Sequence, residues 1–264
     1  MANDKTTAIT CELAIKHASL DVLRNALSPL KSQGVFNYTW DASSHTLITT
    51  GSVPPSFIVS ALRSADLSVI VRGITGIQDP SLFADGVVAA VAILEYHPPL
   101  FPPYPVSTSL SIDTCPRGLI RFIRGNQETI LDCALAQLDA QQPCQVSIRT
   151  RGDLSNPPDS LGPIYSHEST LLSWNITADT HGNASLVVEV PRLDLSDLIG
   201  CSVSVVSVPP PHVTDQHGRK ETRTACGVIA RSAGVFANTK QICACSGKTL
   251  WQEAEFLDAH PGKL

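Results

Sequence analysis

Hydrophobic and polar positions in the first 75 residues follow two alternating periods. Extended segments are separated by two segments with apolar residues at helical spacing, such as Leu20, Leu23, Leu27 and Leu30. Pro29 lies in the turn that closes the first helix, and prolines open the second helix. The expected elements are a strand at 6–15, a helix at 17–30, strands at 35–40 and 46–51, a helix at 54–65 and a strand at 67–74.

This βαββαβ order fits a small α+β domain of the ferredoxin-like type over residues 1–75. From residue 76 the pattern becomes all-β, with eight short β-rich runs separated by turn signals such as RGNQ and DTHGN. Eight such strands over 76–234 predict a barrel or a sandwich. A proline-rich insertion near 97–110 interrupts the series, and the pattern fades into a short tail at 235–264.

The composition is that of a folded protein with no nucleic-acid partner. Hydrophobic residues make up 43% of the chain and charged residues 16%, so a sizeable core can be buried. The net charge of −5 and the lack of a Lys/Arg run argue against a nucleic-acid or anionic-membrane surface. The longest apolar run, residues 87–94, is too short to span a membrane, and the N-terminal sequence has no signal-peptide core. The protein is therefore expected to be soluble and intracellular.

Cysteine spacing divides the eight thiols into isolated residues and one pair. Only Cys243 and Cys245, separated by a single alanine, form a local cluster. An intracellular chain of this size need not carry a disulfide framework. Five of the other cysteines lie singly, mostly in apolar runs, and are expected to be small buried residues: Cys11, Cys115, Cys133, Cys144 and Cys201.

The stretch GVIARSAGVFANTKQICACSGKTLWQE, residues 227–253, resembles the C-terminal signature of the copper chaperones for superoxide dismutase. AAVAILE at 89–95 and TACGVIARSAG at 224–234 resemble the first and last strands of that family's barrel, which is similar to Cu,Zn superoxide dismutase. The resemblance implies a heavy-metal-associated ferredoxin-like domain at 1–75, a dismutase-like Greek-key barrel at 76–234 and a Cys-x-Cys tail at 235–264. It also implies a cytoplasmic protein, with the mitochondrial intermembrane space as a second compartment.

The chain departs from the dismutase at the metal ligands. Where the dismutase has histidines, this chain has Ser147, Arg149, Ile164 and Val206, and none of its eight histidines forms an H-x-H or H-x-x-x-H pair. Arg223 matches the anion-guiding arginine of the dismutase, but without a metal it is expected to be a surface relic. The barrel is therefore expected not to turn over superoxide, and zinc is not expected as a cofactor.

Two further departures concern the N-terminal domain and the barrel's disulfide. Family members carry M-x-C-x-x-C in the first loop, whereas Ala14, Lys16 and Ser19 stand at the aligned positions here. A lysine ammonium would repel copper, so this domain is expected to have lost its metal site and to serve as a spacer or recognition element. Pro158 replaces one cysteine of the dismutase disulfide, so Cys226 is expected to be a free buried thiol unless another cysteine pairs with it.

The tail pair has the chemistry that Cu(I) requires. Cu(I) is soft and prefers two or three thiolates, and Lys240 and Lys248 favour the thiolate form of Cys243 and Cys245. A disulfide between the two would close a small, strained ring, and strain makes a disulfide a better oxidant for the thiols of a client. The pair is therefore the expected Cu(I) site and thiol–disulfide exchange centre. Two incidental cysteines or a zinc half-site are the alternatives, although zinc would need two more ligands and the tail offers only His260.

The dismutase dimerises through a self-complementary patch, and the resemblance implies that this barrel presents the same patch to a dismutase monomer. Cys201 stands where the dismutase has an arginine, and the glycines in the patch also suit turn geometry. The implied partner-binding residues are Gly152, Asp153, Ile199, Gly200, Val228, Ala230 and Arg231.

The sequence thus predicts a copper chaperone with thiol–disulfide exchange activity rather than an active dismutase. It is expected to dock on immature Cu,Zn superoxide dismutase as a heterodimer, deliver Cu(I) and promote oxidation of the client's intrasubunit disulfide. A homodimer of the free chain is left open. The alternative is a non-catalytic, dismutase-like binding module whose cysteines only respond to redox conditions.

Overall fold

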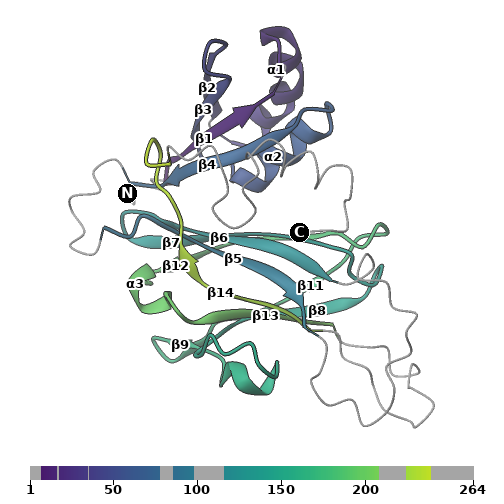
Figure 1. Ribbon diagram of the computed structural model, residues 1–264, viewed down its shortest axis with the longest axis vertical. Helices are drawn as coiled ribbons and strands as arrows, with labels where there is room; N and C mark the ends of the chain where they lie inside the picture. The colour runs from purple at the N-terminus through teal and green to yellow at the C-terminus, as the bar shows by residue number, and fades with distance from the viewer. Residues whose placement is uncertain are drawn as a thin grey trace, which may run out of the picture.

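The computed structural model describes residues 7–16, 18–34, 36–77, 86–97, 116–207 and 224–238. In this part the chain forms a four-stranded sheet with two helices, then a nine-stranded antiparallel sheet that curves into a nearly closed barrel (Figure 1). None of the described helices has the length and apolar character needed to cross a membrane. Most of the proline-rich insertion and the Cys-x-Cys pair lie outside the described residues.

The N-terminal region, residues 7–77, has the βαββαβ order predicted from the pattern. Its sheet order β2-β3-β1-β4, with antiparallel neighbours, is the ferredoxin-like topology. Cys11 and Leu13 of β1 are fully buried in one core with Leu23 and Leu27 of α1, because alternate residues of a strand point to the same face. The elements are β1 (Ile9–Ile15), α1 (Leu20–Leu27), η1 (Ser28–Ser32), β2 (Phe36–Asp41), β3 (Thr46–Gly51), α2 (Pro55–Arg63) and β4 (Val69–Thr75).

All eight β-rich runs predicted for the second part form strands. They lie in the order β11-β8-β13-β14-β5-β6-β7-β12, with β15 also pairing with β5, so neighbours in space are often distant in sequence, as in a Greek key. The strands are β5 (Ala89–Tyr96), β6 (Arg117–Arg124), β7 (Glu128–Ala136), β8 (Pro143–Arg149), β11 (Ser173–Thr177), β12 (Ala184–Pro191), β13 (Ser202–Ser207), β14 (Thr224–Val228) and β15 (Ala230–Arg231).

Three short features of the barrel were not predicted from the sequence. They are the 3-10 helix η4 (Asp159–Leu161), the hairpin of β9 (Ser166–His167) and β10 (Thr170–Leu171), and the helix α3 (Leu195–Leu198). Each lies in a connection between barrel strands and leaves the strand order unchanged. The division of the chain at 76 and 235 stays a prediction.

The barrel and the N-terminal region share a hydrophobic core. Ile123 of β6 and Ile130 of β7 belong to the same buried cluster as the helices of the N-terminal region. Asp132 of β7 is fully buried, and its carboxylate accepts a hydrogen bond of 2.9 Å from the backbone N–H of Ser56 in the first turn of α2. The Arg121 guanidinium lies 3.6 Å from the same carboxylate oxygen. A barrel carboxylate thus caps a helix of the N-terminal region and joins the two parts.

Candidate functional site

Three of the residues expected to bind the partner meet at the end of β14. A Cβ atom on Gly152 would stand 2.5 Å from the carbonyl oxygen of Gly200 and 3.2 Å from a methyl carbon of Val228, so the close approach requires glycine. Gly200 has a φ of +87°, and its N–H donates to the carbonyl of Ile229 at 3.0 Å. Glycine is therefore required at position 152 by the close approach of Gly200 and Val228, and it is favoured at position 200 by the positive φ. Together the two glycines allow three chain segments to meet at one surface.

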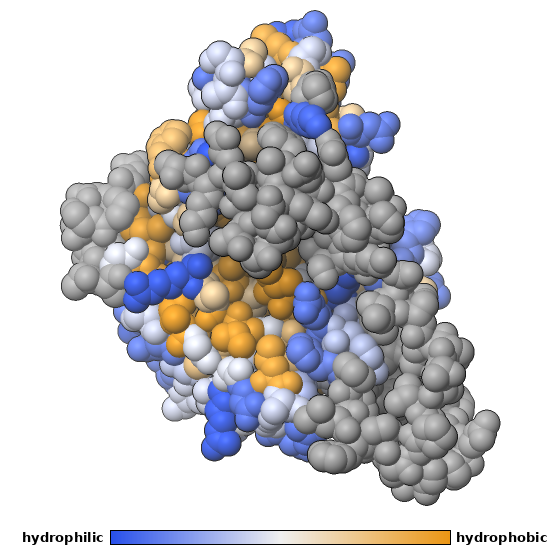
Figure 2. All heavy atoms as spheres, viewed as in Figure 1, coloured by the Kyte–Doolittle hydropathy of each residue, from blue (hydrophilic) through white to orange (hydrophobic). Residues whose placement is uncertain are grey.

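An exposed isoleucine that the sequence analysis missed extends this surface. Ala230 pairs with Val91 of β5, and the same register on either side places Val228 opposite Ile93. Ile93 is 52% exposed and Val228 is 37% exposed. Figure 2 shows apolar side chains gathered over β5 and β14. We call the set Ile93, Gly152, Gly200 and Val228 the Val228 patch. Ile199, also expected to bind the partner, precedes Gly200 in the chain and is partly buried against the barrel core.

The other predicted partner-binding residues adjoin the Val228 patch along the chain. Ala230 and Arg231 form β15 and are both exposed. The carboxylate of Asp153 accepts hydrogen bonds from the side chain of Ser155 and, at 2.9 Å, from its backbone N–H, and these bonds hold the pKa of that carboxyl below its usual range. Asp153 therefore orders its own loop, which leaves the apolar residues as the main contact surface.

Cys201 does not contribute a side chain to this surface. Its thiol is buried, 3.7 Å from the carbonyl oxygen of Thr150 and 3.6 Å from that of Asp197. Burial raises the pKa of the Cys201 thiol. At the position expected to match an arginine of the dismutase, the cysteine here turns inward and adds no charge to the neighbouring surface.

Two of the four barrel positions expected to match histidine ligands of the dismutase carry a hydroxyl and a guanidinium group. Ser147 is buried, with its Oγ 2.9 Å from the Oγ of Ser173. Arg149 donates from Nε to the Oγ of Ser204 and from Nη1 to the carbonyl of Gly162, both at 3.1 Å. A guanidinium held in place by two hydrogen bonds repels a metal cation at close range. Within the described ranges, no group of three or more His, Cys, Asp or Glu residues could hold a metal ion.

The first loop of the N-terminal region is likewise built from residues with structural partners. Ala14 is buried on β1, and the backbone N–H of Lys16 donates to the carbonyl of Ser68 at 3.3 Å. Ser19 caps α1, because its Oγ accepts a hydrogen bond of 3.3 Å from the backbone N–H of Val22. At the aligned second-cysteine position the chain thus carries a helix cap in place of a thiolate.

The five cysteines that the structure describes are free, buried thiols. Burial raises the pKa of Cys11 and of Cys226 to about 12 and that of Cys144 to about 11, and it also raises the pKa of Cys133. A copper ligand or nucleophile must be a thiolate, and these thiols stay protonated at neutral pH. The expectation that Cys11, Cys133, Cys144 and Cys201 are buried is confirmed, and Cys226 is a free buried thiol. Cys115, Cys243 and Cys245 lie outside the described residues.

These shifts predict that the five buried thiols resist alkylation in the folded protein. At pH 8 a thiol with a pKa of 12 is ionised about 1000-fold less than one with an unshifted pKa of 9, so its reaction with iodoacetamide slows in proportion. Raising the pH to 9 should leave Cys11 and Cys226 unmodified in a short pulse, while the same pulse in urea should modify both. Mass spectrometry of the digested protein measures this, and native-state labelling of either thiol would contradict the assignment.

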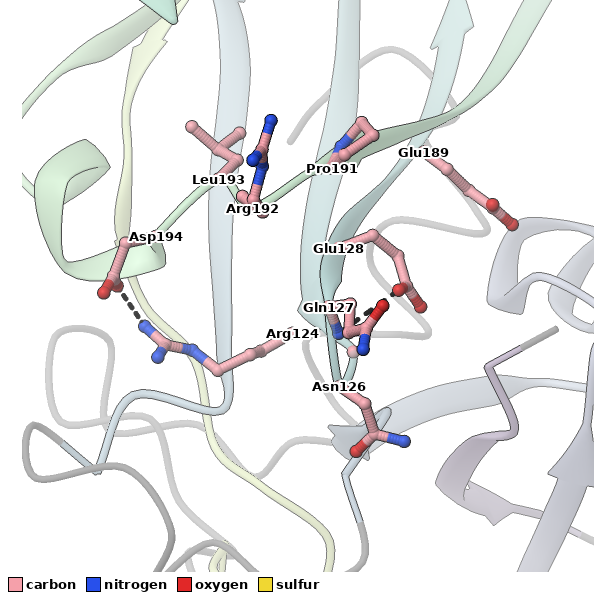
Figure 3. A pocket seen from close by; sticks show the side chains of 10 residues that line it. Arg124, Asn126, Gln127, Glu128, Glu189, Pro191, Arg192, Leu193 and Asp194 are labelled. Atoms are coloured by element: carbon pink, nitrogen blue, oxygen red, sulfur yellow. Dashed lines mark hydrogen bonds and ion pairs between the residues drawn. The ribbon is translucent and has the colours of Figure 1, made fainter. Parts of the chain in front are cut away.

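A cleft of about 780 Å³ lies beside the junction of the two parts but offers no soft metal donor. Figure 3 shows Arg124 pointing toward Asp194, with which it forms an ion pair. Asp194 also accepts a hydrogen bond from Ser196 at the start of α3, and Glu128 accepts one from Thr7. The cleft lining contains no sulfur and no imidazole: it comprises Arg124, Gly125, Asn126, Gln127, Glu128, Glu189, Pro191, Arg192, Leu193 and Asp194. The charged groups of the cleft therefore mainly form ion pairs and hydrogen bonds within the protein.

The fold and the site together define a class of protein. A ferredoxin-like unit precedes a Greek-key barrel of the Cu,Zn superoxide dismutase type, and the barrel exposes an apolar surface patch. No protein-family model matches the chain.

Comparison with individual proteins narrows this class. The chain is 35% identical to the superoxide dismutase 1 copper chaperone of Debaryomyces hansenii over 244 residues, which cover 86% of each protein. It is 31% identical to the protein of the same name from Saccharomyces cerevisiae, over 83% of each. It is 25% identical to the copper chaperone for superoxide dismutase of Mus musculus, over 96% of this chain and 91% of the mouse protein. The chain belongs to the family of copper chaperones for superoxide dismutase.

Proposed function

We propose that the chain docks on immature Cu,Zn superoxide dismutase, delivers Cu(I) and promotes oxidation of the client's intrasubunit disulfide. The observation that carries the proposal is the Val228 patch, an exposed apolar surface on a barrel of the client's own architecture. Two barrels of one architecture can associate through equivalent patches, as in a two-fold dimer. The same patch can bind a second copy of this chain, so a homodimer would compete with the client.

Copper handling falls to Cys243 and Cys245 in this proposal. The described thiols are buried and protonated, whereas Cu(I) requires thiolates. The N-terminal region then acts as a heavy-metal-associated domain without its metal pair. Its helix cap at Ser19 and the inward-pointing thiol of Cys11 support this division of labour.

Disulfide transfer uses the oxidised form of the same pair. A client thiolate attacks one sulfur of the Cys243–Cys245 disulfide and forms a mixed disulfide, which the second client thiol resolves. The client loses two electrons and two protons, and the tail pair becomes a dithiol. Molecular oxygen or another two-electron acceptor must reoxidise the pair before the next cycle. The pair therefore alternates between a dithiol form, which binds Cu(I), and a disulfide form, which oxidises the client.

Copper stoichiometry tests this proposal. The double variant Cys243→Ser/Cys245→Ser should lose one equivalent of Cu(I) per chain after a wash with a moderate chelator, and it should no longer oxidise the client's cysteines. Cys115→Ser is the matched control, because it removes one isolated thiol and should keep both properties. Metal analysis and thiol alkylation of the client give the two readouts. Equal copper in the double variant and the wild type would place the site elsewhere, and no copper in either would favour the redox-responsive binding module.

A further inference from the structure

The segment that follows the last barrel strand returns to the N-terminal region. The backbone N–H of Ser232 still donates to the barrel, to the carbonyl of Ala89 at 2.9 Å. One residue later the carbonyl of Ala233 accepts a hydrogen bond of 3.2 Å from the backbone N–H of Ile74 on β4. Figure 1 shows this segment (yellow) rising from β14 to the end of β4. Because β4 is an edge strand of its sheet, the segment covers part of an edge that would otherwise be open.

Two backbones touch where this segment crosses β4. A Cβ atom on Gly73 would stand 2.2 Å from the carbonyl oxygen of Gly234 and 2.9 Å from the Cα of Val235. Real Cβ atoms do not approach backbone atoms so closely, so any larger residue at position 73 forces the segment away from the sheet. Glycine at this position is explained by the crossing.

A β-bulge directs an arginine toward the same segment. Glu12 of β1 pairs with Gly73 of β4, but the next residue, Leu13, pairs with Val71. Arg72 is therefore the extra residue of a bulge, and bulges change the direction in which a side chain points.

The bulge brings a buried carboxylate and a partly buried guanidinium against the segment's main chain. Glu12 is only 5% exposed, and its Oε2 accepts a hydrogen bond of 2.6 Å from the backbone N–H of Phe236. Arg72 donates from Nη2 to the carbonyl of Asn238 at 2.9 Å, and its Nε lies 3.8 Å from Oε1 of Glu12. Hydrogen bonds with an ionised partner are among the stronger ones in proteins. The Glu12 carboxylate thus has its partners in the Phe236 N–H and in the bulged arginine, and the arginine also holds Asn238.

We propose that Glu12, Arg72 and Gly73 form a clamp that fixes residues 233–238 to the N-terminal region and so positions the Cys-x-Cys tail for transfer to the client. The inference rests on the proposed function of Cys243 and Cys245. Cys243 is the fifth residue after Asn238 but the eleventh after Ser232, where the barrel's own hold on the chain ends. Release of the clamp therefore lengthens the linker before Cys243 from five to eleven residues. Because effective concentration falls roughly as the −3/2 power of linker length, the effective concentration of the tail pair at the docked client should fall about threefold.

Hydrogen exchange of the full-length chain tests the clamp itself. In Glu12→Ala and Gly73→Ala, the amides of Phe236 and Ile74, whose N–H groups join the segment to the N-terminal region, should exchange about 10- to 100-fold faster, because each change removes or displaces these hydrogen bonds. Glu12→Gln keeps an oxygen acceptor for the Phe236 N–H and should give a smaller increase. Thr10→Val, two residues earlier on the same face of β1, is the matched control and should leave exchange unchanged. A urea midpoint measured for each variant identifies any that fail to fold, and Gly73→Ala tests the clamp without removing a charge.

The positioning role is read from client activation by the copper-loaded chain. Glu12→Ala and Gly73→Ala should activate reduced dismutase about threefold more slowly, with copper per chain unchanged and with activity partly restored in Glu12→Gln. If hydrogen exchange is unchanged in both variants, the clamp does not exist. If hydrogen exchange is faster but both variants activate the dismutase at the wild-type rate, the clamp has no role in transfer. Failure of the proposed function is distinguishable, because the wild-type chain itself would then bind no copper or activate no client, whatever the exchange data show.

Discussion

The substitution Val228→Asp is expected to abolish stable association between this chain and reduced, copper-free dismutase. Val228 lies at the meeting point of the segments that carry Gly152 and Gly200, opposite the exposed Ile93. A carboxylate there would lose its hydration in the complex without gaining a partner, and buried, unpaired charges at the centre of an interface weaken binding by about 100-fold or more. The barrel itself should stay folded, because the side chain of Val228 points outward and the neighbouring Ile229 fills the core.

Val187→Asp provides the matched control for this prediction. Val187 is 39% exposed, close to the 37% of Val228, but it lies on β12 at the end of the sheet order. Co-elution of each variant with the client in size-exclusion chromatography, followed by titration calorimetry, measures the difference. Arg231→Glu on β15 should weaken association in the same direction. Equal binding by Val228→Asp and the wild type would show that the client contacts another face.

The periodic parts of the fold could be predicted from the sequence because local pattern and tertiary burial agree in them. On β1, alternation places Cys11 and Leu13 in the core of the N-terminal region, and leucines at helical spacing bring Leu23 and Leu27 of α1 to the same core. The η4 helix, the β9–β10 hairpin and α3 were missed because elements of two to four residues are too short to show a period.

The candidate site was only partly predictable, for a different reason in each part. The run VVAAVAIL is apolar throughout, so it does not separate the outward Ile93 from the buried Ala92 and Leu94. The alternation of side chains along a strand does separate them, because Ile93 lies on the same face as Glu95 and opposite to Ala92 and Leu94. The Phe236 N–H that donates to Glu12 lies more than 200 residues away along the chain, and no local pattern predicts such a contact. The signal that was present is a carboxylate whose neighbours on both sides in the strand are apolar, and the same signal marks Asp132.

Asp132→Ala is expected to have the largest effect on stability. Burial raises the pKa of the Asp132 carboxyl and the Arg121 charge opposes that shift, so the two groups depend on each other inside the junction. Removing one partner of a buried ion pair costs about 3–5 kcal/mol, because the remaining charge keeps no counter-charge. The total free energy of unfolding of a typical protein is about 5–15 kcal/mol. The variant should therefore unfold at a much lower urea concentration, measured by circular dichroism.

Two companion variants separate the charge from the helix cap. Asp132→Asn keeps an oxygen that can accept the hydrogen bond from Ser56 but has no charge, so it should lose less stability than Asp132→Ala. The double variant Arg121→Leu/Asp132→Leu removes both charges, and replacing a buried ion pair by apolar residues is often neutral. It should therefore recover most of the stability lost in Asp132→Ala, although the Ser56 N–H stays without its acceptor. If the double variant is no more stable than Asp132→Ala, the loss of stability comes from the missing hydrogen bond to Ser56 and not from the unpaired charge of Arg121. The helix cap would then be what holds the N-terminal region and the barrel together.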